Sequence, residues 1–95
     1  MENKIALRFT RHGLERLFQR QISPKDCEEV FESGEVIESY PDDKPFPSKL
    51  YSYAVKGRNL HVVIAIEGQV VHVITAYEPD YALWENDLKT RKKKK

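Results

Sequence analysis

The spacing of apolar and polar residues predicts two helices in the first third of the chain. Apolar side chains recur at intervals of three and four between residues 11 and 21, and Thr10 precedes them as a suitable N-cap. Ser23-Pro24 begins a second helix, because a capping hydroxyl stands before proline at the first helical position. Gly34 is a natural end for that helix.

Alternation of apolar and polar residues, or short runs rich in valine and isoleucine, predicts strands elsewhere in the chain. A loop with three prolines in seven residues, 41–47, separates two of these strands. The last two strands are apolar on both alternating faces, so we expect both sides of the sheet centre to be covered. The predicted strands cover residues 5–9, 35–40, 50–55, 60–66 and 70–77.

These elements define an α+β fold, in which two N-terminal helices pack on a three- to four-stranded antiparallel sheet. A chain of 95 residues forms one compact domain, which we place at residues 1–88. Residues 89–95, with six basic side chains and no acids, are expected to be a disordered basic tail. A short C-terminal helix is predicted from Ala82, Leu83, Trp84 and Leu88.

Charge is unevenly distributed along the chain. The net charge is +1, but without the tail ten basic residues face 15 acidic ones, which gives −5. A nucleic-acid site on such a body must therefore be a local basic patch. Between residues 4 and 20, five basic residues oppose only Glu15. The patch consists of Lys4, Arg8, Arg11, Arg16 and Arg20.

The composition indicates a soluble, cytoplasmic protein. The single cysteine, Cys27, cannot form an internal disulfide and is expected as a core residue of the second helix. No signal peptide is recognisable, and no apolar run approaches the roughly 20 residues that span a membrane. The three histidines lack the spacing of metal ligands, so we expect neither a metal nor a cofactor.

Candidate chemistry begins on the first helix. At helical spacing, His12, Arg16 and Arg20 lie on one face, which places an imidazole beside fixed positive charge and suits phosphodiester chemistry. The alternative is that these residues are the solvated side of an ordinary amphipathic helix. Its buried stripe would consist of Leu14, Leu17 and Phe18.

A second imidazole is expected on the sheet. A three-residue turn between the last two strands places His61 opposite Thr75, with Tyr77 on the same face, whereas a two-residue turn gives Ile74 as the partner. Two histidines at a phosphodiester divide the roles of general base and general acid, and arginine stabilises the phosphorane oxygens. His72 shares its face with apolar neighbours and is interpreted as structural.

Several short motifs follow one another along the chain: Phe9-Thr10-x-His12 with Arg16 and Arg20, Ile22-Ser23-Pro24, residues 33–38, residues 40–43, Pro47-Ser48, residues 60–63 and residues 73–80. In this order, over about residues 8 to 85, they resemble a small prokaryotic family known as domain of unknown function 4258. That family is similar to the ribonuclease group that includes RelE-like toxins, barnase, EndoU and the colicin nucleases.

The resemblance implies a metal-independent endoribonuclease of toxin type, in which attack by the 2′-hydroxyl leaves a 2′,3′-cyclic phosphate. It implies His12 and His61 as the acid–base pair and Arg16 as a phosphate ligand. RNA and a small antitoxin-like protein are the expected partners. The implied substrate contacts are Arg20, Thr75 and Tyr77.

Two other functions are open at this point. One is a non-catalytic RNA- or protein-binding module, in which the basic patch is a surface and the histidines lie apart. The other is a structural domain whose exposed strand at residues 35–40 pairs with a partner. The nuclease predicts that His12, Arg16 and His61 converge on one phosphate, so the positions of the histidines discriminate among the three.

Overall fold

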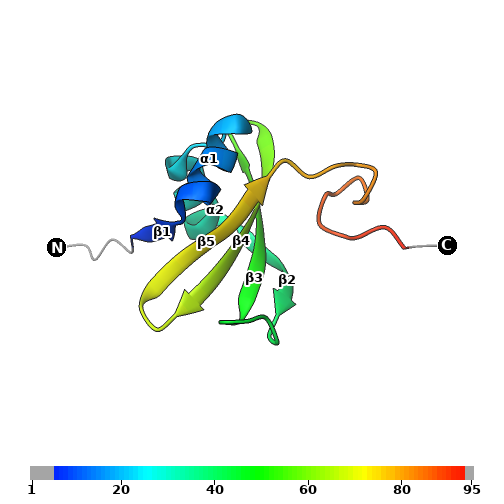
Figure 1. Cartoon of the computed structure of the whole chain (residues 1–95). Helices are drawn as coiled ribbons and strands as arrows, with labels where there is room; N and C mark the ends of the chain where they lie inside the picture. Colours follow the sequence, from blue (N-terminus) through cyan, green and yellow to red (C-terminus); the bar gives the residue numbers. More distant parts are fainter. Residues whose placement is uncertain (1–5, 94–95) are drawn as a thin grey trace.

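A mixed β-sheet carries both helices on one face (Figure 1). The computed structural model describes residues 6–93. Within them the sheet has five strands in the order β1-β5-β4-β3-β2. The elements are β1 (Leu7–Phe9), α1 (Arg11–Gln19), α2 (Pro24–Ser33), β2 (Glu35–Tyr40), β3 (Ser48–Val55), β4 (Arg58–Glu67) and β5 (Val70–Tyr77).

Both helices begin at the predicted caps. The Thr10 hydroxyl accepts a hydrogen bond from an amide in the first turn of α1 at 2.9 Å. Ser23 and Asp26 form a reciprocal capping box, in which each side chain accepts from the other's backbone amide at 3.0 and 2.9 Å. α2 ends at Gly34, where a Cβ atom would collide with the carbonyl oxygen of Val30.

Replacing Ser23 with alanine is expected to lower the free energy of unfolding by about 1 kcal/mol, because the first turn of α2 loses its acceptor. Urea unfolding followed by circular dichroism measures this change. Ser33→Ala, at the exposed end of the same helix, is the matched control and should stay within about 0.5 kcal/mol of the wild type. Equal stability of the two variants would contradict the capping argument.

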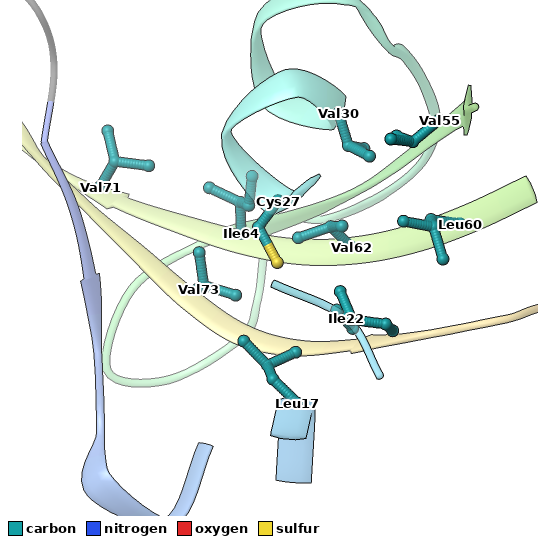
Figure 2. Packing of buried hydrophobic residues seen from close by; sticks show 11 residues of the cluster. Leu17, Ile22, Cys27, Val30, Val55, Leu60, Val62, Ile64, Val71 and Val73 are labelled. Atoms are coloured by element: carbon teal, nitrogen blue, oxygen red, sulfur yellow. The ribbon is translucent and has the colours of Figure 1, made fainter. Parts of the chain in front are cut away.

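The main core lies between the helices and the sheet (Figure 2). Cys27 points from α2 toward Val62 and Ile64 on β4, and Val30 of α2 belongs to the same core; all four side chains are at most 1 % exposed. α1 contributes Leu17 to this core. The interpretation of Cys27 as a core residue of the second helix is therefore confirmed.

The apolar stripe predicted for α1 is only partly buried. Leu17 is 3 % exposed, but Leu14 is 41 % and Phe18 is 85 % exposed. α1 lies beside the short edge strand β1 and the end of β5, so the sheet beneath it is too narrow to cover a wide stripe. The helix therefore presents apolar as well as basic side chains to solvent.

The predicted antiparallel sheet of three to four strands is wrong, because β1 forms an additional edge strand parallel to β5. Leu7 lies opposite Val71, and Phe9 lies opposite Val73. The chain between β1 and β5 provides the long connection that a parallel pair requires. Ile5, which the sequence also assigned to this strand, lies outside the described residues.

The predicted C-terminal helix is also wrong. The chain after β5 forms turns, and Trp84 makes an isolated bridge with Arg91. Asp80 accepts a hydrogen bond from the amide of Ala82 at 2.8 Å, and Asp87 accepts from two following amides. Local bonds of this kind compete with helix formation, because they occupy the amides that a helix would use.

Residues 78–93, which we call the C-terminal segment, lie on the sheet face opposite the helices (Figure 1). Trp84 is 1 % exposed and packs with Leu88 and Leu50 in a second small core. Both faces of the sheet centre are therefore covered, as the valine- and isoleucine-rich strands predict.

The boundary predicted at residue 88 falls within this segment. Lys89 Nζ lies 2.7 Å from Glu35 of β2, and Arg91 Nε lies 3.0 Å from Glu38 of the same strand. The Arg91 guanidinium also lies 4.6 Å from the centre of the Trp84 ring. Basic side chains on the tail side of the boundary thus contact the sheet, while the last two residues lie outside the described part of the chain.

A bulge sets the register between β4 and β5. A two-residue turn joins the strands, and Ile74 has no direct partner in β4. The bulge adds one residue to the offset, so His61 lies opposite Tyr77. The predicted partners Thr75 and Ile74 are both wrong for two reasons. The turn consists of residues 68–69, which alone would place His61 opposite Ala76, and the bulge then shifts the pairing by one further residue.

Candidate functional site

A cavity of about 250 Å³ lies between the start of α1 and the second half of β5. We call it the helix-side cavity. It is on the sheet face that carries the helices, beside the bulge at Ile74. Bulges next to active sites commonly change the direction in which side chains point. Its polar lining comes from Thr10, His12, Arg16 and Thr75.

The structure brings His12 and Arg16 together in this cavity, four residues apart on α1. Within the described residues, neither side chain is in an ion pair. The amide groups at the start of α1 lie at the positive end of the helix dipole. The helix-side cavity is therefore suited to an anion.

Arg20 connects the end of α1 to β5. Its guanidinium donates hydrogen bonds to the carbonyl oxygen of Ala76 at 2.8 Å and to the Thr75 hydroxyl at 3.3 Å. The carbonyl oxygen of Arg20 in turn accepts from Arg58 at 2.7 Å. Arg20 thus positions Thr75 and the helix, whereas Thr75 itself lines the cavity.

His61 and Tyr77 lie on the opposite face of the sheet. His61 is completely buried, its Nε2 atom lies 2.6 Å from the carbonyl oxygen of Leu88, and its ring packs edge-on against Trp84 with centroids 4.7 Å apart. Tyr77 packs beside it with ring centroids 5.5 Å apart. The sheet therefore separates His61 from His12, and the two imidazoles do not meet at one phosphate.

The buried imidazole of His61 is held neutral. The carbonyl of Leu88 requires a proton on Nε2, which leaves Nδ1 as an acceptor, and Nδ1 has no hydrogen-bond partner among the described residues. Burial lowers the pKa of His61, and the hydrogen bond to Leu88 offsets part of that effect. His61 is thus a structural residue of the second core in this arrangement.

Stability should fall in mild acid because of His61. Since its pKa is lower in the folded than in the unfolded chain, the unfolded state binds the proton first as the pH drops below about 6.5. We expect a loss of up to about 1.4 kcal/mol per pH unit there, measured by urea unfolding. His61→Gln should flatten this slope and the control His72→Gln should keep it; equal slopes for His61→Gln and the wild type would contradict the assignment.

A second cavity, of about 420 Å³, lies on the other side of the β1–β5 pair, beneath the proline-rich loop. We call it the loop-side cavity. Its lining includes Arg8 of β1, Lys44 and Phe46 of the loop, and His72 of β5. Both cavities share Phe9 and Thr10 at the end of β1 and Val73 and Ile74 in the middle of β5.

The sequence interpretation missed His72 and Phe46 as site residues. Arg8 lies directly opposite His72 in the parallel pair, a contact that no local pattern reveals. The His72 Nε2 atom lies 3.1 Å from the Glu67 carboxylate. The available signal was the proline-rich loop itself, because such loops often form the rim of a site.

Other reactive groups lie away from the two cavities. Burial, with a smaller contribution from Asp26, raises the pKa of the Cys27 thiol to about 12, so this thiol stays protonated. Among residues 6–93, no group of three or more His, Cys, Asp or Glu side chains is placed to hold a metal ion. No helix in the described part of the chain has the length and apolar character to cross a membrane.

The fold and its cavities define a small α+β domain with a mixed sheet and with basic side chains at two cavities beside its parallel strands. The chain matches the family described as Domain of unknown function (DUF4258) over residues 9–78, and it belongs to that family. The matched region contains His12, Arg16, Phe46 and His72. Comparison with curated proteins and with solved structures gave no match.

Proposed function

We propose that this domain is a metal-independent endoribonuclease that binds the scissile phosphate in the helix-side cavity. The observation that supports this most is the joint position of His12 and Arg16 in that cavity. In cleavage by 2′-hydroxyl attack, an imidazole can serve as the general base and a guanidinium can stabilise the phosphorane oxygens. The start of α1 adds backbone amides that favour a phosphate.

His12 is the general base in this mechanism. Its imidazole takes the proton of the 2′-hydroxyl, and the 2′ oxygen attacks the adjacent phosphorus. The bond from phosphorus to the 5′ oxygen breaks, which leaves a 2′,3′-cyclic phosphate, and water supplies a proton to the 5′ oxygen. Arg16 stabilises the negative charge that develops on the phosphorane oxygens.

The remaining residues expected at the site have different roles here. Thr75 contacts the substrate with its hydroxyl, since it lines the same cavity. Arg20 is a positioning residue, because its donors are directed to Thr75 and to the backbone of Ala76. His61 and Tyr77 take no part in the mechanism, since they lie on the other face of the sheet.

Incubation of the purified protein with a mixed-sequence RNA in the presence of EDTA tests the proposal. We expect fragments that end in 2′,3′-cyclic phosphate, identified by mass spectrometry. Intact RNA after prolonged incubation with protein shown to be folded by circular dichroism would reject the nuclease.

A non-catalytic RNA-binding module is the second candidate. It is favoured by the separation of the histidines, which this function predicts: His61 lies in the second core, so His12 is the one imidazole that lines the helix-side cavity. This function predicts that RNA binds in an Arg16-dependent way and is recovered intact. A filter-binding titration run beside the cleavage assay distinguishes the two functions.

We also propose that the domain binds a small antitoxin-like protein. The exposed Phe18 and Leu14 on α1 support a protein contact at this helix, because they leave apolar surface uncovered close to His12 and Arg16. Co-expression with the product of a neighbouring gene, followed by size-exclusion chromatography with and without Phe18→Ala, tests this. Co-elution that the substitution does not change would place the contact elsewhere.

A further inference from the structure

The floor of the loop-side cavity is one cross-strand row of the sheet. Ser48 of β3 pairs with Ala65 of β4, Ala65 pairs with His72 of β5, and His72 pairs with Arg8 of β1. Directly paired residues project from the same face, and neighbouring strands lie about 4.8 Å apart. Because the Ala65 side chain is small, the row is hollow between Ser48 and His72.

An aromatic pair forms one wall of this cavity. The ring of Phe46 lies parallel to that of His72, with 2° between the planes and 6.1 Å between the centroids. Asp43 in the same loop accepts a hydrogen bond from the Ser48 hydroxyl at 2.6 Å, which ties the loop to β3. The prolines further restrict the loop backbone, so the Phe46 ring is held over the floor.

The charges at the cavity are mainly positive. Arg8 and Lys44 both line it, and within residues 6–93 neither is in an ion pair. Asp43 also lines the cavity, but its carboxylate already accepts from Ser48. An aromatic wall with two unpaired cations favours a ligand that combines a planar ring with an anionic group.

The size of the cavity fits the same ligand. Its volume of about 420 Å³ lies within the range of roughly 300–1,000 Å³ typical of small-molecule sites. The helix-side cavity, at about 250 Å³, is smaller and suits a phosphate with part of its sugar. The two cavities meet at Thr10 and Ile74, so adjacent nucleotides of one strand can occupy them together.

We propose that the loop-side cavity is a nucleotide-binding subsite, in which the base stacks on Phe46 and the phosphate contacts Arg8 and Lys44. The inference rests on the proposed function in one respect, namely that the subsite receives the nucleotide next to the scissile phosphate. The floor, the wall and the charges do not depend on that chemistry.

Titration of the protein with each of the four ribonucleoside 3′-monophosphates, followed by isothermal calorimetry and by amide chemical shifts, tests the subsite. We expect at least one of them to bind, with amide shifts centred on Lys44, Phe46, Ser48 and His72. Phe46→Ala should raise the Kd by about tenfold or more, the effect expected for a lost base–aromatic stack. Arg8→Ala should weaken binding and make it less dependent on salt concentration, because it removes a phosphate contact.

Matched controls separate the subsite from unspecific effects. Phe18→Ala removes a phenylalanine that is 85 % exposed on α1, and Lys56→Ala removes an exposed lysine in the β3–β4 turn. Both should leave the Kd unchanged. Lys44→Ala, at an exposed loop position, serves as the second test if Phe46→Ala does not fold.

The outcomes distinguish this inference from the nuclease. Nucleotide binding that depends on Phe46, without cleavage of RNA, supports the subsite and rejects the nuclease. Cleavage of RNA together with no binding of any of the four nucleotides, or with equal Kd values for the wild type and Phe46→Ala, rejects the subsite alone. Shifts centred on His12 and Arg16 would equally reject it, because they would place the nucleotide in the helix-side cavity.

Discussion

Replacing His12 with alanine is expected to reduce the rate of RNA cleavage by about 10²- to 10⁴-fold, the usual contribution of a general acid–base group. His12 is the imidazole that lines the helix-side cavity, and its side chain is exposed at the start of α1. In the proposed mechanism, removing it takes away the acceptor for the 2′-hydroxyl proton but leaves Arg16, the proposed phosphate ligand, in place. The RNA affinity should therefore change much less than the cleavage rate.

The stability of this variant should stay close to that of the wild type. Substitutions at exposed positions without special contacts usually change the free energy of unfolding by less than about 0.5 kcal/mol. The matched control is Arg11→Ala on the same turn, whose side chain is 95 % exposed and does not line the cavity. Wild-type cleavage by His12→Ala, or an equal loss in Arg11→Ala, would remove His12 from the mechanism.

Arg16→Ala gives a second, independent measure of the same site. Loss of a group that stabilises charge in the transition state commonly costs about 10²- to 10³-fold in rate. Unlike His12→Ala, this variant should also bind RNA more weakly and with a shallower dependence on salt, because a phosphate contact is lost.

Local signals predicted the parts of the fold that depend on neighbouring residues. Ser23 with Pro24 defines the start of α2, and a helical spacing of four places His12 and Arg16 on one side of α1. These features need only bonds within a helix, so the sequence contains the information. The sharing of one cavity by His12 and Arg16 follows from the same spacing.

The errors arose where distant segments meet. Three residues of β1 carry no signal for a parallel partner, and the bulge at Ile74 changes the offset of β5 by one residue. Because β4 has apolar residues on both faces, its pattern of apolar and polar residues does not indicate which face the helices cover. The sequence therefore could not place His61 on the face opposite His12.

The C-terminal segment also shows where prediction from the sequence fails. Its apolar residues have helical spacing, but Asp80 and Asp87 bind nearby amides and form turns instead. The segment is held on the sheet by Trp84, which packs with Leu88 and with Leu50 of β3 in the second core. A helix periodicity can thus be outweighed by short-range side-chain bonds together with one large buried ring.

Replacing Trp84 with alanine should therefore lower the free energy of unfolding by about 3–5 kcal/mol, the range for removing a large buried aromatic side chain. The ring is 1 % exposed, packs against His61 and lies beneath the Arg91 guanidinium. For a domain of this size, each kcal/mol lowers Tm by about 4–8 °C. Urea unfolding and thermal scans measure both quantities.

Tyr81→Ala is the matched control, because Tyr81 belongs to the same segment and is 57 % exposed. It should change stability by less than about 0.5 kcal/mol, and a Trp84→Ala value equally small would show that the segment does not hold the second core together.

Removing Trp84 should also expose His61 and bring its pKa back toward the ordinary value, since burial is the main cause of the lowering. RNA cleavage by the folded fraction should persist in this variant, because the helix-side cavity lies on the other face of the sheet. The second core and the proposed site therefore lie on opposite faces of one sheet, so we expect Trp84→Ala to affect stability and His12→Ala to affect cleavage.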